Sequence, residues 1–142
     1  MADLNPLIRL RKYRVEEKQK VLADLFREAE ALEGRKAGLL ARKDQEQKIT
    51  EEKGDYETHS AFILFAERVR HEVESIDEAI AKLNVRIGIA QDAMREAFGE
   101  LKKVEIIQRN RDEAEQAAEN KKESQTLDEV AIEGHRRKND EK

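Results

Sequence analysis

The sequence predicts an all-α protein in which two long helices form an antiparallel, two-stranded coiled-coil hairpin. Charged residues make up 42% of the 142-residue chain and aromatic residues 4%, which leaves few large side chains for a globular core. Strong helix formers (Ala, Glu, Lys, Arg, Leu and Gln) dominate the composition. Apolar residues recur at alternating spacings of three and four along two long segments, which is the pattern of a coiled coil.

The first helix is expected over residues 5–53. Asn5 followed by Pro6 suits a helix start, because proline is favoured at the first helical position. Basic residues interrupt its apolar seam, and their methylenes can lie along the seam while their charges reach water. The seam positions are Leu4, Ile8, Arg11, Val15, Lys18, Leu22, Leu25, Ala29, Leu32, Lys36, Leu39 and Lys43.

A turn is expected over residues 54–60. Gly54 suits the position that follows a helix, where the left-handed conformation is common. Asp55, Thr58 and Ser60 are each able to cap the following helix, and the sequence does not distinguish among them.

The second helix is expected to pair with the first over residues 60–108. Its seam is apolar at every position and ends where Gln108 comes into phase. These positions are Phe62, Ala66, Val69, Val73, Ile76, Ile80, Leu83, Ile87, Ala90, Met94, Ala97, Leu101 and Val104. Residues 109–142 are therefore expected to form an unpaired helical tail, frayed when free or docked on a partner.

The two seams are complementary when the chain folds back near residue 56. Facing residues then have numbers that add up to about 112, so that Leu32 faces Ile80 and Leu25 faces Ile87. Leu4 falls opposite Gln108, where the second seam ends. A parallel dimer of one continuous helix is the alternative, but it leaves Gly54 and the break in phase near the turn unexplained.

No residue pattern indicates a catalytic, cofactor-binding or metal site, and the chain is not expected to be an enzyme. His59, His71 and His135 lack the spacing of a helical zinc site, and no Lys-Ser/Thr pair accompanies Gly34 and Gly38 as a phosphate loop requires. The near-balance of 28 basic and 32 acidic residues argues against nucleic acid as a partner. No apolar run predicts membrane insertion, and the absence of cysteine fits a cytoplasmic protein.

Acidic residues near the turn support a less favoured alternative. Transcript-cleavage factors carry paired carboxylates at the tip of a similar hairpin and hold a metal inside RNA polymerase. Glu51, Glu52 and Asp55 would fill that role here. Those factors also have a separate globular domain, which this chain lacks, so a solvated turn is favoured.

Two surfaces are candidates for partner binding. Four consecutive apolar residues, Phe62 to Phe65, point all round a helix, and one partner helix covers only one side. A hydrophobic cap on the hairpin and a binding patch explain them equally well. The second surface is the basic N-terminal segment, where six basic residues stand against two acidic ones; the basic ones are Arg9, Arg11, Lys12, Arg14, Lys18 and Lys20.

Both ends of the chain resemble the FliJ family of flagellar type III export proteins. The opening Leu7-Ile8-Arg9-Leu10-Arg11-Lys12, with Glu16-Glu17 and Leu22-Ala23, is similar to the start of that family. The stretch Leu127-Asp128-Glu129-Val130-Ala131, with Glu119-Asn120-Lys121-Lys122 before it and Arg136-Arg137-Lys138 after it, is similar to its C-terminal motif. The resemblance extends to length and hairpin layout, whereas the middle of the chain matches no motif.

The resemblance implies a non-enzymatic stalk that promotes assembly and activity of the FliI-like export ATPase hexamer. It also implies contact with the FlhA-like export gate, an escort role toward substrate chaperones, and a peripheral place at the export apparatus on the inner membrane. Carried onto this sequence, the ATPase-binding residues would be Leu7, Arg9, Arg11, Arg14, Leu127, Asp128 and Glu129. The gate-binding residues would be Phe62, Leu64 and Phe65. A generic coiled-coil holdase is the alternative from another class.

Overall fold

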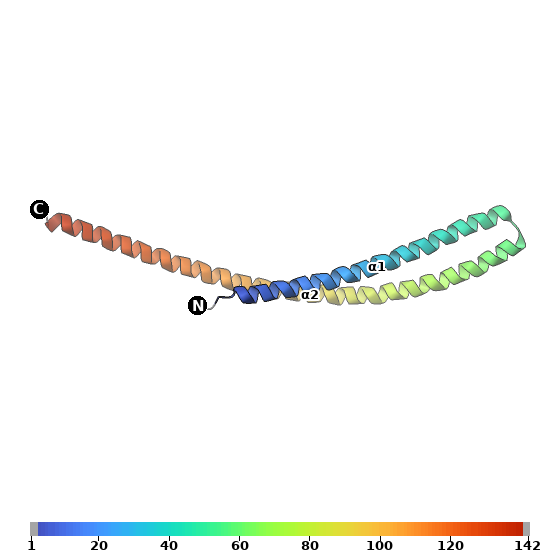
Figure 1. Cartoon of the computed structure of the whole chain (residues 1–142), viewed down its shortest axis with the longest axis horizontal. Helices are drawn as coiled ribbons and strands as arrows, with labels where there is room; N and C mark the ends of the chain where they lie inside the picture. The colour runs from blue at the N-terminus through green and yellow to red at the C-terminus, as the bar shows by residue number, and fades with distance from the viewer. Residues whose placement is uncertain (1–2, 141–142) are drawn as a thin grey trace. The chain divides into compact units, whose positions relative to one another are not determined.

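The structure, a computed structural model, describes residues 3–140, which form two helices joined by a short turn (Figure 1). Helix α1 spans Asn5–Lys53 and helix α2 spans Tyr56–Asp140. The helices pack against each other as an antiparallel hairpin, which confirms the predicted fold class. Tyr13–Ala97 form one unit, here called the hairpin unit. The other described residues, up to Lys12 and from Phe98 onward, form the terminal unit, and each unit is described by itself.

The core of the hairpin unit lies along the predicted seam. Leu25, Leu83 and Ile87 are buried in one cluster, and Leu22, Ala29, Leu32 and Ala90 pack around it. Val15, Val69 and Ile76 are also buried. Burial of each such side chain contributes roughly 1.5–3 kcal/mol. Because a two-stranded coil buries only one stripe of each helix, this narrow seam supplies most of the stabilisation.

Polar residues complete the α1 side of the seam in ways that the sequence pattern did not reveal. Lys36 reaches Asp77 across the hairpin, with 2.8 Å between Nζ and Oδ1, and this hydrogen bond raises the pKa of Lys36. The seam also continues past Lys43 to Thr50, which is buried. Its hydroxyl donates to the Glu46 carbonyl at 2.8 Å, so the buried oxygen is satisfied within its own helix.

The turn is shorter than expected, because α2 begins at Tyr56 and not at Ser60. Gly54 adopts a φ of +63°, and its N–H donates to the Thr50 carbonyl at 3.0 Å, closing the end of α1. Asp55 then caps α2, since its Oδ1 accepts the Thr58 N–H at 2.7 Å. One residue for each cap therefore suffices to reverse the chain.

Replacing Asp55 with alanine is expected to lower the thermal unfolding temperature at pH 7. Hydrogen bonds from the Thr58 hydroxyl and N–H hold the pKa of Asp55 below its usual 3.8. A carboxyl with a lowered pKa in the folded state stabilises fully above the unfolded pKa and loses this contribution as pH falls through the folded value. Thermal unfolding followed by circular dichroism should therefore show the wild-type advantage intact at pH 7 and shrinking only below about pH 4.

The matched control for the cap is Asp55→Asn, because asparagine also caps helices but does not titrate. This variant should unfold at a temperature closer to that of the wild type than Asp55→Ala does. Its difference from Asp55→Ala should not change with pH. An Asp55→Ala defect that persists undiminished at the lowest pH would contradict the assigned role of the carboxylate.

In the terminal unit, the start of α1 packs along α2. Leu101 and Val104 are buried, and the Leu4 N–H donates to Gln108 Oε1 at 3.1 Å. This bond lies at the end of the seam. From residue 112 to residue 140 every side chain is exposed, although the helix continues. The last two residues of the expected tail, 141–142, lie outside the described residues. Within residues 3–140, neither helix has a stretch long and apolar enough to span a bilayer.

Candidate partner-binding surfaces

The basic N-terminal residues divide into exposed and packed side chains. In the terminal unit, Arg9 is exposed, Leu7 is half-buried, and Arg11 occupies a seam position. The Nε atom of Arg11 is buried and has no hydrogen-bond partner within residues 3–140. Arg14 belongs to the hairpin unit and is exposed. Arg9 and Arg14 therefore offer their charges to a partner, whereas Arg11 also contributes packing.

The C-terminal residues carried over from the resemblance are all exposed. Leu127, Asp128 and Glu129 lie on α2 where no other part of the terminal unit covers it. Gln108, which meets Leu4, precedes Leu127 by 19 residues, and this separation corresponds to about 28 Å along a helix. The structure thus does not bring Leu127 together with Leu7 and Arg9; they form two separate surfaces.

The turn-proximal apolar residues are exposed to very different degrees. Phe62 is half-buried in the seam, and Phe65 is half-buried beneath Arg42, whose guanidinium carbon lies 5.4 Å from the ring centroid. Leu64 is 67% exposed and Ile63 55% exposed. Of the three predicted gate-binding residues, only Leu64 therefore presents most of its side chain to a partner without any rearrangement.

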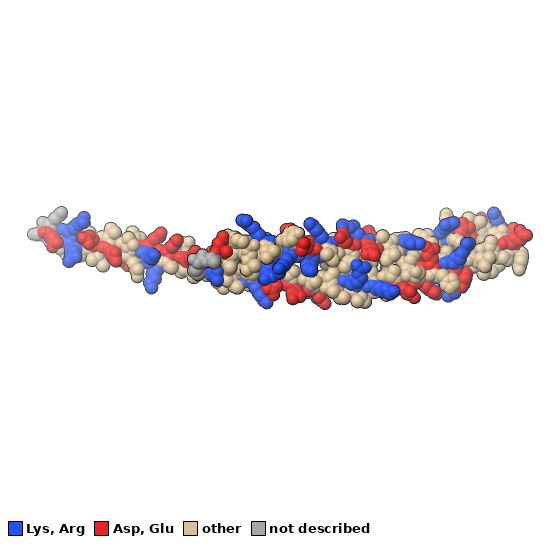
Figure 2. Space-filling view, turned by 60° about the horizontal axis from the view of Figure 1, so that its bottom comes forward, with Lys and Arg blue, Asp and Glu red and all other residues tan. Residues whose placement is uncertain are grey.

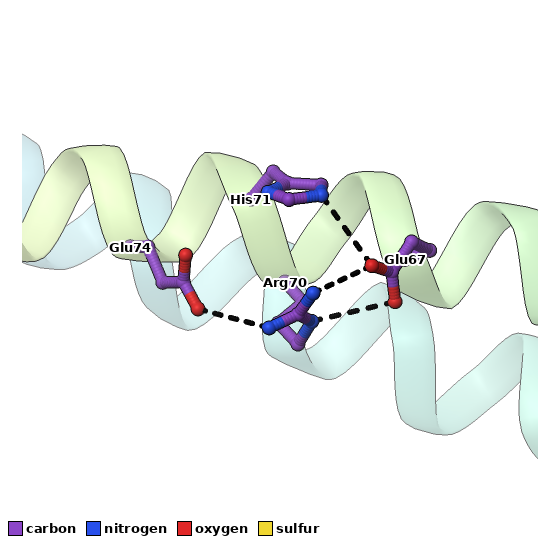
Figure 3. A network of polar contacts seen from close by, with 4 residues as sticks. All are labelled: Glu67, Arg70, His71 and Glu74. Carbon is purple, nitrogen blue, oxygen red and sulfur yellow. Dashed lines mark hydrogen bonds and ion pairs between the residues drawn. The ribbon is translucent and has the colours of Figure 1, made fainter.

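Charged side chains beside this patch are paired with one another. Arg70 binds Glu67 at 2.5 Å and Glu74 at 3.2 Å, and His71 lies 3.4 Å from Glu67 (Figure 3). The hydrogen bond from Arg70 lowers the pKa of Glu67. All of these groups are exposed, so the network neutralises charge locally and contributes little to stability. Figure 2 likewise shows basic and acidic side chains interspersed along the surface.

The acidic turn does not gather its carboxylates into one site. Asp55 is engaged as the cap of α2, and Glu51 accepts a hydrogen bond from Gln47 at 3.5 Å. Among residues 3–140, no group of three His, Cys, Asp or Glu side chains is arranged to hold a metal ion. Glu51, Glu52 and Asp55 therefore do not form such a group.

Sequence reasoning overlooked a groove on the hairpin unit that is lined by both helices. Val21 from α1 and Ile89, Ala93 and Arg86 from α2 are among its residues. Val21 and Ile89 stand beside the seam, and a seam pattern alone does not reveal how much of them the opposite helix covers. The only sequence signal for this groove was an apolar residue next to a seam position. Such residues are common in coiled coils.

A protein-family model described as "Flagellar FliJ protein" matches residues 1–140 of the chain. No curated protein and no solved structure matches it. The matched residues include both helices and both the N-terminal and the C-terminal candidate surfaces.

Proposed function

The chain belongs to the flagellar FliJ family, and from this premise we propose that it is a non-enzymatic stalk that promotes assembly and activity of the hexameric export ATPase. Membership by itself makes it a flagellar, export-related protein. The stalk role, the contact with an export gate and the escort of substrate chaperones are the finer parts of the proposal. They would place the protein in the cytoplasm, peripheral to the export apparatus at the inner membrane.

The observation that carries the proposal is the bare helix at the end of α2. From residue 112 to residue 140 no side chain is covered, although Leu127, Val130 and Ile132 are apolar. Because most helical stability in proteins comes from packing of an apolar face, such a helix gains stability when a partner surrounds it. An ATPase ring that encloses this tail would bury those residues, and Arg9 and Arg14, which are exposed, would make separate contacts with the ATPase.

The test is direct stimulation of a purified export ATPase. Adding the chain should raise the rate of ATP hydrolysis and the fraction of hexamer, while the chain alone hydrolyses no ATP. A chain that binds unfolded substrates broadly and leaves the ATPase rate unchanged would support the holdase alternative instead.

The gate contact is proposed at the exposed turn-proximal residues, with Leu64 at its centre. Replacing Ile63 and Leu64 with serine should weaken binding to the cytoplasmic part of the export gate protein about tenfold or more. Each buried side chain of this size contributes roughly 1.5–3 kcal/mol, and about 1.4 kcal/mol corresponds to tenfold. Isothermal titration calorimetry measures the dissociation constant, and circular dichroism should show an unchanged unfolding temperature.

Two further variants serve as controls for the measurement of gate binding. Val85→Ser removes an equally exposed apolar side chain elsewhere on the hairpin unit and should leave gate binding intact. Phe65→Ser loses the contact with Arg42 and should lower stability as well as binding. Normal gate binding by the Ile63/Leu64 variant would make the patch only a hydrophobic cap on the hairpin.

A further inference from the structure

The groove on the hairpin unit combines an apolar surface with two cations, Lys18 and Arg86. It has a volume of about 300 Å³. Leu25 and Ala90 belong to the seam, and Val21, Ile89 and Ala93 flank them. Ile89 is 65% exposed and Val21 50% exposed, so each has an apolar face that the hairpin itself leaves uncovered. Small alanines on α2 leave this space because they cannot fill the volume beside the seam.

Lys18 and Arg86 complete the lining at opposite ends of the groove. Under the pairing of the hairpin, in which Leu25 and Ile87 share one cluster, Arg86 lies level with residue 26 of α1. Lys18 is eight residues before that level, so the two cations are about 12 Å apart along the axis. Lys18 is exposed even though it occupies a seam position, and it directs its charge to solvent.

Charges near the groove are distributed unequally. Neither Lys18 nor Arg86 forms an ion pair or a side-chain hydrogen bond within residues 3–140. Two acids near the groove are engaged elsewhere: Asp24 pairs with Arg27, and Asp92 with Arg95. Nearer the turn, two cations are paired across the hairpin, Arg35 with Glu72 and Lys36 with Asp77. Within residues 3–140, Lys18 and Arg86 themselves are thus the cations of the groove that stay outside these ion pairs.

We propose that this groove docks an acidic amphipathic helix of another protein, forming a local three-helix bundle. The apolar face of the incoming helix would cover Val21 and Ile89, as ridges of side chains pack into the furrow between two helices. Two carboxylates seven or eight residues apart on that helix span about 12 Å and would meet Lys18 and Arg86. A concave, helix-sized surface with a cation at each end fits a helix better than it fits a flat anionic membrane.

The test uses the full chain and two synthetic helical peptides. Both carry a leucine stripe; one has glutamates seven residues apart beside it, and its twin has lysines at the same positions. Titrations followed by two-dimensional ¹⁵N NMR should shift the amides of Val21, Ile89 and Ala93 with the glutamate peptide. The lysine twin should bind at least about tenfold more weakly, because it faces like charges.

Variants of the chain separate docking from general charge attraction. Arg86→Glu should lower the affinity of the chain for the glutamate peptide about tenfold. Ile89→Ser should lower its affinity for both peptides. Lys20→Glu changes the charge equally on an exposed residue outside the groove and should have no effect. Equal affinity of the two peptides, or shifts located elsewhere, would overturn the proposal.

Other occupants of the groove would give different results with the same variants. Concentration-dependent self-association of the chain that Ile89→Ser abolishes would assign the groove to a second copy. Binding to vesicles of anionic lipid that Arg86→Glu abolishes, without binding of the glutamate peptide, would assign it to a membrane surface. Either result would replace the proposed occupant, and neither depends on stimulation of the export ATPase.

Discussion

Replacing Leu83 with aspartate is expected to lower the unfolding temperature of the hairpin unit sharply. Leu83 is 3% exposed and lies in the cluster with Leu25 and Ile87. The substitution removes buried methyl groups and places an unpaired carboxylate in the seam, at a cost on the order of 4 kcal/mol or more. Small domains are stable by only about 5–15 kcal/mol. Thermal unfolding followed by circular dichroism should show a greatly reduced unfolding temperature.

Val85→Asp is the matched control for this prediction. It introduces the same side chain two residues away on the same helix, but Val85 is 64% exposed. Its unfolding temperature should stay close to that of the wild type, since surface substitutions away from special features usually cost less than about 0.5 kcal/mol. Equal destabilisation by the two variants would show that the seam between α1 and α2 is not the core of this unit.

Charge reversal at the exposed arginines is expected to abolish stimulation of the export ATPase. The resemblance implicates Arg9, Arg11 and Arg14 together, but Arg11 also packs in the seam with its Nε atom buried. Arg9→Glu with Arg14→Glu is therefore the sharper variant, because both side chains are exposed. Steady-state ATP hydrolysis by the hexamer should fall to its unstimulated rate, and the helicity of the chain should not change.

The control for the ATPase prediction is Lys20→Glu with Lys48→Glu, which changes two exposed cations in the same way. If stimulation depends on where the charges lie and not on the net charge of the chain, this variant should stimulate the ATPase as the wild type does. Stimulation by the wild type should also weaken with added salt, as screening reduces attraction between exposed charges. Full stimulation by the Arg9/Arg14 variant would refute the role of the basic end.

The helices and their pairing were predictable because they depend on information within short stretches of sequence. A three-four apolar repeat identifies a seam whatever lies elsewhere in the chain, and two seams of matching length require a reversal between them. Gly54 marked that reversal, since the left-handed conformation after a helix favours glycine. The end of the seam at Gln108 likewise predicted where the partner helix begins, and Leu4 bonds to that residue.

The candidate surfaces were predictable only in part, because exposure depends on what the opposite helix covers. The sequence grouped Phe65 with Leu64, yet Arg42 from the other helix shields Phe65 and leaves Leu64 bare. It placed Arg11 in the seam and expected its charge to reach water, whereas the structure buries its Nε atom. Each outcome depends on a neighbour distant in sequence.

The sequence by itself thus determined which stripe of each helix is buried and where the chain turns back, since both follow from local periodicity and backbone preference. The tertiary structure alone decided which residues beside that stripe stay uncovered. Two helices in contact still leave gaps wherever facing side chains are small, as at Ala90 and Ala93. The depth of such a gap, and the pairing of the charges around it, depend on both helices together.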